Sequence, residues 1–139
     1  MCFMKKIVVT SPKHLVLAIA SRRKELEVDA ISLSMSSQVS LKFLSQLENG
    51  KDSVEVKSLL KVTRSLGVDI PLLNNPKKLG TLIVNKRKDL GIDQITAASM
   101  SGISPRLLST IERGEPNKRL NKLFSVIRGL GITFEIHIK

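Results

Sequence analysis

The stretch Asp93–Gly114, DQITAASMSGISPRLLSTIERG, predicts two short helices joined by a tight turn. Asp93 can cap the first helix, because its carboxylate accepts the free amide hydrogens that open a helix. Gly102 stands where the backbone must turn left-handed, which glycine does without steric cost. Ser104 caps the second helix and Pro105 takes its first position, where a missing N–H costs nothing.

Ala98 leaves room for two helices that cross steeply after a three-residue turn, which is the arrangement of a DNA-binding helix-turn-helix. The spacing resembles the Cro/C1-type (Xre) helix-turn-helix of lambdoid phage repressors, and the residues that carry it are Gln94, Ala98, Gly102, Ile103, Leu108 and Ile111. The ERG that follows, and LGITFEI after one more helix, resemble HipB-like antitoxins, which pair with HipA-type kinases.

Composition favours a duplex-DNA partner. The chain has 139 residues, of which 42% are hydrophobic and 3% aromatic, so we expect one domain of ordinary size or two small ones, with Leu, Ile and Val cores. The shortage of aromatic rings argues against single-stranded nucleic acid, whose bases stack on such rings. The net charge of +11 favours a polyanion, of which duplex DNA is the simplest, although an anionic membrane surface or an acidic protein would also suit it.

Cys2 is the one cysteine, so no internal disulfide can form, which fits a reducing cytoplasm. The apolar run near the N-terminus is split at Pro12-Lys13-His14, so we do not interpret it as a signal peptide. No run approaches the length that crosses a bilayer. We therefore expect a cytoplasmic protein with no membrane partner.

The chain overlays itself without a gap when shifted by 64 positions, so that Pro12–Ile70 falls on Pro76–Phe134 with twenty identities over 59 positions. This predicts a mainly all-α fold of two tandem lambda-repressor-like helix-turn-helix modules, with short β-strands at the termini and after each module. The expected parts are an N-terminal arm (1–11), a divergent first module (12–73) and a second module with a C-terminal strand (74–139).

Apolar periodicity and caps predict the elements within each module. The expected helices are His14–Glu27, Asp29–Met35, Ser40–Glu48 and Val54–Ser65, then Lys77–Leu90, the pair described above and Leu120–Arg128. In the first of them we expect Leu15, Ala18, Ile19 and Leu26 to face the core.

The expected strands are Lys5–Thr10, Val68–Leu72 and the alternating tail ITFEIHIK, residues 132–139. Pro71 cannot donate a ladder hydrogen bond, so the second strand must lie at a sheet edge or stop there. An exposed tail strand needs a partner. The antitoxin resemblance supplies it across a homodimer, whereas the repeat suggests an intramolecular pseudo-dimer.

The resemblance assigns base contacts to the early exposed positions of each recognition helix. In the second module these positions are Pro105, Arg106 and Thr110, and in the first module they are Leu41, Lys42 and Gln46. An arginine at this point can bond both acceptors of guanine, worth roughly 1–3 kcal/mol of discrimination, and a glutamine can read adenine. The alternative for Arg106 is contact with phosphate alone.

The first module departs from the pattern, since Ala30 replaces Gln94 and Gln38 replaces Gly102. We therefore expect its turn to be strained or differently shaped. Two interpretations stay open: the first module reads bases, or it is a degenerate copy kept for pairing.

Supporting contacts also follow from the resemblance. Phosphate contacts are expected from Gln94, Ser104, Lys118 and Arg119, although the last two could form a merely solvated basic face. Ion pairs that tie the first helix of a module to its recognition helix are expected between Arg87 and Glu112 and between Arg23 and Glu48.

No catalytic motif, metal-ligand spacing or phosphate-binding glycine loop is found, and neither His14 nor His137 has ligands around it. We expect a protein that is not an enzyme and has no cofactor. Sequence-specific binding of double-stranded DNA, as a transcriptional repressor, is the favoured function. The alternative is a HipB-like antitoxin that neutralises a kinase toxin and regulates its own operon.

Overall fold

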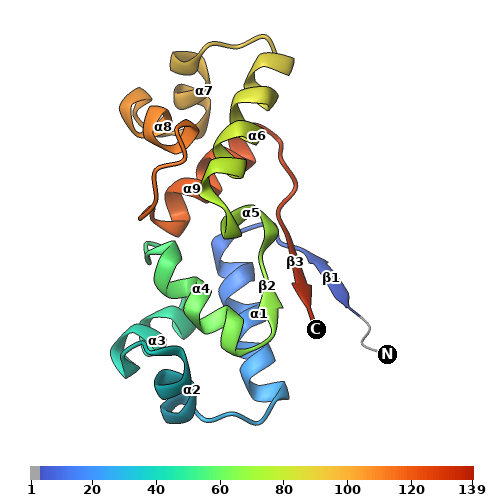
Figure 1. The fold of residues 1–139 in the computed structure, drawn as a ribbon, viewed down its shortest axis with the longest axis vertical. Coiled ribbons are helices and arrows are strands. Elements are labelled where there is room, and N and C mark those ends of the chain that lie inside the picture. Colours follow the sequence, from blue (N-terminus) through green and yellow to red (C-terminus); the bar gives the residue numbers. More distant parts are fainter. Residues whose placement is uncertain (1–3) are drawn as a thin grey trace.

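The computed structural model describes residues 4–139, so Cys2 and the first three residues of the predicted arm lie outside the described residues. The described chain is mainly helical with short strands, which confirms the predicted fold class (Figure 1). The helices are α1 (Pro12–Glu25), α2 (Ala30–Ser37), α3 (Leu41–Glu48), α4 (Val56–Ser65), α5 (Pro71–Asn74), α6 (Pro76–Asp89), α7 (Gln94–Ser101), α8 (Pro105–Glu112) and α9 (Leu120–Gly129). The strands are β1 (Lys5–Val8), β2 (Val68–Asp69) and β3 (Glu135–Ile138).

The helices form two groups of four with the same element order. Each helix of the first helix group (α1–α4) begins and ends 64 residues before its counterpart in the second helix group (α6–α9). The first group fills the lower half of Figure 1 and the second group the upper half. One hydrophobic core runs through both groups, so they form a single packed body.

The two helix groups meet through a short backbone ladder. The Val56 N–H donates to the Lys118 carbonyl (3.0 Å), and the Leu120 N–H donates to the Val54 carbonyl (2.9 Å). These hydrogen bonds flank an antiparallel bridge between Glu55 and Arg119. The shift of 64 residues makes residues 54–56 equivalent to residues 118–120, so the two hydrogen bonds involve equivalent atoms and are related by a local two-fold axis.

The three strands form one antiparallel sheet in the order β1–β3–β2. The tail alternates as predicted, with Phe134 and Ile136 buried, and its strand lies between the other two. Phe134 stacks on Phe124 with ring centroids 4.7 Å apart, which anchors the tail to α9. The strands thus join the N-terminal arm and both helix groups.

The predicted strand Val68–Leu72 is wrong in extent, because β2 spans only Val68–Asp69. Pro71 instead takes the first position of the short helix α5, where its fixed φ suits a helix. The strand β2 does lie at the sheet edge and does stop before Pro71, as expected.

Other predicted boundaries also shift. The helix α1 begins at Pro12 rather than His14, because Ser11 caps it by accepting the His14 N–H (3.0 Å). It ends at Glu25, so Leu26 is 40% exposed and not part of the inner face. Val16, which the pattern missed, is buried instead.

The turn of the first helix group has the same shape as that of the second. Gln38 is left-handed, with φ 58° and ψ 42°, and Gly102 has φ 69° and ψ 28°. Of the two predicted outcomes, the turn is therefore strained rather than differently shaped, at a cost of about 1 kcal/mol for a residue with a Cβ. The Ser34 hydroxyl supports this turn by donating to the Val39 carbonyl (2.6 Å).

We expect Gln38→Gly to raise the free energy of unfolding by about 0.5–1 kcal/mol, because it relieves the left-handed strain. The matched variant Gly102→Gln should lower it by a similar amount, and since open space surrounds Gly102, no steric clash adds to the effect. Urea denaturation followed by circular dichroism measures both. Destabilisation by Gln38→Gly would contradict the strain.

Candidate nucleic-acid interface

Local caps position the helix pair α7–α8. The Asp93 carboxylate accepts the Thr96 N–H (2.7 Å), and the Ser104 hydroxyl accepts the Leu107 N–H (3.1 Å). Ala98 is fully buried. The turn and both caps are therefore placed as the sequence predicts, and the small residue lies in the core.

The N-terminal turn of α8 points into solvent. Ser104, Pro105 and Arg106 are all exposed, whereas Leu108 and Ile111 are buried and hold the opposite side of the helix on the core. Within residues 4–139 the Arg106 guanidinium makes no hydrogen bond or ion pair, so its planar fork is free to bind a ligand outside the protein.

Residues 83–136 match the sequence profile of a protein family described as Helix-turn-helix. The second helix group is a helix-turn-helix domain of the Cro/C1 type. The matched segment runs from α6 through α9 into β3 and leaves the first helix group outside. Searches of curated proteins and of solved structures gave no match. The resemblance to HipB-like antitoxins stays a prediction.

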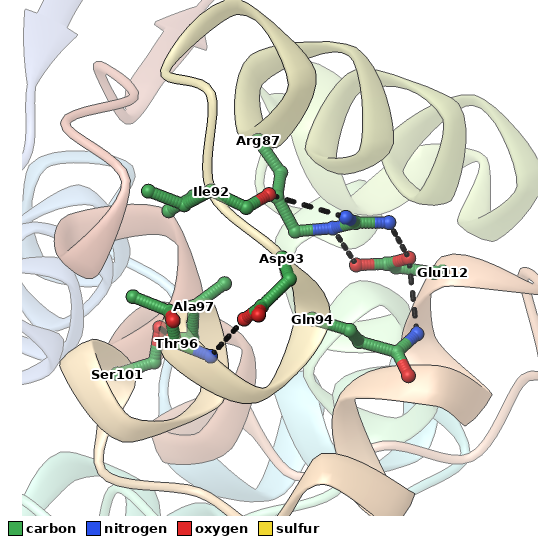
Figure 2. Close-up of polar contacts among 8 residues, drawn as sticks. All are labelled: Arg87, Ile92, Asp93, Gln94, Thr96, Ala97, Ser101 and Glu112. Carbon is green, nitrogen blue, oxygen red and sulfur yellow. Dashed lines mark hydrogen bonds and ion pairs between the residues drawn. The ribbon is translucent and has the colours of Figure 1, made fainter.

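A largely buried ion pair fixes the recognition helix of the helix-turn-helix, as Figure 2 shows. Arg87 on α6 donates from Nε and Nη2 to the two carboxylate oxygens of Glu112 on α8, at 3.0 Å each. The side chains are only 16% and 7% exposed. The hydrogen bond to Glu112 is the main reason why the pKa of Arg87 is raised. The pair therefore locks α8 to α6 at a defined angle.

Gln94 joins this cluster at the start of α7. Its Nε2 donates to Glu112 Oε1 (3.2 Å), and Arg87 Nη1 donates to the Ile92 carbonyl (3.3 Å) just before that helix (Figure 2). One carboxylate thus holds three helices of the domain. The structure places Gln94 beside Glu112, and its predicted phosphate contact stays a prediction.

Thr110 on α8 and Lys118, which follows that helix, lie together. The Thr110 hydroxyl donates to the Leu107 carbonyl (2.7 Å) and accepts from Lys118 Nζ (2.6 Å). Arg119 lies apart from them, at the junction of the helix groups, where its Nη1 donates to the Ser53 carbonyl (2.9 Å). Lys118 and Arg119, which the sequence predicts as one basic surface, therefore lie at different places, the first beside the recognition helix and the second at the junction.

The first helix group repeats the ion pair with one bond fewer. Arg23 Nη2 lies 2.8 Å from Glu48 Oε1, and the side chains are 19% and 17% exposed. Ala30 stands where Gln94 stands in the second group, so the third hydrogen bond to the carboxylate is missing. The recognition helix α3 is still tied to α1 by the same type of contact.

The three candidate base-reading residues of α3 are Leu41, Lys42 and Gln46. Leu41 is 48% exposed, Lys42 is exposed, and the half-buried Gln46 accepts from Lys51 Nζ (3.5 Å). Helices α3 and α8 both lie on the left side of Figure 1, opposite the sheet. The structure therefore brings the two helices that carry the candidate residues to one side of the molecule.

Charge is distributed unequally between the two halves. Residues 76–139 contain twelve Lys and Arg against five Asp and Glu, a net charge of +7. Residues 12–75 contain nine against seven, a net charge of +2. A polyanion should therefore be attracted more strongly to the second half. In the described part of the chain, no helix is both long and apolar enough to cross a membrane.

The capping carboxylates make the two helix pairs sensitive to acid. The Thr96 N–H that donates to Asp93 lowers the pKa of that carboxyl, and the Ser32 N–H does the same at Asp29. Because folding lowers these pKa values, the caps stabilise the protein above the ordinary pKa of aspartate. That stabilisation is lost as the pH falls through the lowered values.

Sequence reasoning missed the role of Gly80. A Cβ there would lie 2.5 Å from the Glu112 carbonyl oxygen, so only glycine lets α6 approach the end of α8 this closely. A comparison of the two repeats could have revealed this role. Val16 occupies the equivalent position of the first helix group, so glycine is not a general requirement of the module and is specific to the second group.

We expect Glu112→Gln to lower the free energy of unfolding by roughly 3 kcal/mol, because it leaves the guanidinium of Arg87 buried without its counter-charge. The control Glu115→Gln removes the same charge from an exposed pair with Arg113 and should cost less than about 1 kcal/mol. Denaturant unfolding compares the two, and equal losses would show that the buried pair does not fix the domain.

Proposed function

We propose that the protein is a sequence-specific double-stranded-DNA-binding regulator that represses transcription by occupying a promoter. The observation that carries this proposal is the exposed first turn of α8, with Ser104, Pro105 and Arg106 in solvent. This turn belongs to a domain that matches the helix-turn-helix family, and such a helix enters the major groove with its N-terminal residues at the base edges.

Each exposed residue of α8 suits a different contact. Arg106 can donate two hydrogen bonds to guanine, and the Pro105 ring can pack on a thymine methyl group. The Thr110 hydroxyl is already bonded to Leu107 and Lys118, so its methyl group is the part left for a base. Arg106 is thus the main source of specificity in this helix.

Phosphate contacts would orient the helix-turn-helix on the duplex. Gln94 and Ser104 stand at the N-termini of α7 and α8, where the helix dipole and free amides favour a phosphate. Lys118 lies against α8, and Arg119 lies at the junction of the helix groups. The four residues would contact the backbone on both sides of the recognition helix.

The first helix group, within residues 12–73, would contact the same DNA through Leu41, Lys42 and Gln46. Both recognition helices lie on one side of the molecule, and the junction ladder pairs equivalent residues of the two groups. This supports an intramolecular pseudo-dimer of two modules, the second spanning residues 74–139, with residues 1–11 as an arm. The helices would enter successive major grooves about 34 Å apart.

A HipB-like antitoxin is the second candidate, supported by the sequence of ERG and LGITFEI. Against pairing across a homodimer, β3 already has a partner strand on each side within the chain. The antitoxin role predicts that a larger toxin protein co-purifies from the cytoplasm of the native host. It is compatible with DNA binding.

We expect binding to duplex DNA to weaken on the order of a thousandfold between 50 and 200 mM salt if six or more phosphates are contacted.

Arg106→Ala should reduce the preference for the selected sequence by roughly 1–3 kcal/mol. Fluorescence anisotropy with a selected duplex and a scrambled duplex measures both effects.

The control is Lys6→Ala, which removes one exposed positive charge from β1, on the side of the molecule opposite α8. It should leave the sequence preference unchanged. A nearly flat salt response, or equal effects of the two variants, would contradict the proposed interface.

A further inference from the structure

We infer that one chain, acting as a monomer, occupies an asymmetric operator made of two unlike half-sites in inverted orientation. This inference rests on the proposed DNA binding and goes beyond it by specifying the kind of DNA site. It depends on three observations. These are the symmetry of the junction, the pairing of both edges of the central strand β3 with strands of the same chain, and the pattern of differences between α3 and α8.

The orientation follows from the junction ladder. Val56 bonds to Lys118 and Leu120 bonds to Val54, and the bridge between them joins Glu55 to Arg119. Antiparallel pairing of equivalent segments is the geometry of a two-fold, isologous interface. A head-to-tail arrangement would pair unlike segments. The two recognition helices are therefore related by a two-fold axis and should meet half-sites in inverted orientation.

The stoichiometry of one chain per operator follows from the strand pairing within the chain. The tail strand β3 pairs with β1 through the register Lys5↔Ile138 to Val8↔Glu135, and with β2 through Val68↔Ile138. Both of its edges are thus occupied. The strand β1 is only four residues long and carries exposed Lys5 and Lys6, which oppose pairing with another sheet edge. One chain accordingly contains the two-fold arrangement that a repressor dimer forms with two chains.

The asymmetry follows from which positions of α3 and α8 differ. Of the residues that hold each helix in place, Leu44 and Leu108 are identical at equivalent positions, as are Glu48 and Glu112, and the buried pair Leu47 and Ile111 exchanges one apolar residue for another. All three base-facing positions differ, with Leu41, Lys42 and Gln46 in α3 against Pro105, Arg106 and Thr110 in α8. The scaffold of the two helices is thus the same in kind, and the chemistry offered to the bases is not.

The two half-sites should therefore differ in sequence. Arg106 suits guanine through its two-pronged fork, whereas Gln46 suits adenine through its amide. Lys42 is a point charge that can bind guanine or phosphate. The higher charge of residues 76–139 should make the half-site under α8 the stronger of the two.

The test exchanges the base-facing residues and asks whether the operator becomes symmetric. Wild type and two triple variants of the full chain select sites from random duplexes at low salt, and native mass spectrometry counts chains per selected duplex. The first variant, Leu41→Pro, Lys42→Arg and Gln46→Thr, gives α3 the reading residues of α8. The second, Pro105→Leu, Arg106→Lys and Thr110→Gln, is its mirror and keeps the test valid if either variant folds poorly.

Wild type should select a two-part site without sequence symmetry, at one chain per duplex. Each triple variant should select a palindrome, the first built from the α8 half-site and the second from the α3 half-site, with the spacing unchanged. A palindrome bound by two wild-type chains, a direct repeat selected by the variants, or a wild-type site with one half only would each overturn the inference. If wild type selects no sequence, the proposed function fails, and the inference fails with it.

Discussion

The backbone ladder between residues 54–56 and 118–120 is the constraint on which the rest of the structure depends. It consists of main-chain bonds, so it sets the relative position of the two helix groups without depending on particular side chains. The continuous core and the central strand β3 then hold that position. A four-helix module has one recognition helix, and this junction gives the chain two that face the same side.

Within each helix group a carboxylate plays the corresponding role. Glu112 accepts from Arg87 and Gln94, and Glu48 accepts from Arg23, so each recognition helix is held by a largely buried charge. Such pairs fix geometry more than they add stability, because desolvation offsets much of the attraction. Exposed residues at the start of α8 that do not cap it, such as Arg106, can then vary without disturbing the helix. This separation between scaffold and reading residues is what allows the two halves to differ.

Local signals in the sequence predicted the local features well. The caps Asp93 and Ser104 and the turn at Gly102 depend on neighbours three or four residues away, and the structure has them as expected. Leu26 was assigned wrongly because the end of α1 removes it from the helix face. The ladder joins VEV to KRL, which occupy equivalent positions of the repeat but share no residue and lie far apart in the chain, so no sequence pattern predicts its hydrogen bonds. The candidate base-reading residues were placed on α3 and α8, and their contacts with DNA stay a prediction.

In the proposed complex, one chain presents two recognition helices to one face of the duplex. Hydroxyl-radical footprinting of a single selected site measures this most directly, since protein bound to the backbone shields it from cleavage. Two protected patches on the same face, with centres about 10–10.5 base pairs apart, are the expected result. A single patch, or two patches separated by a half-integral number of turns and so on opposite faces, would contradict the arrangement set by the junction.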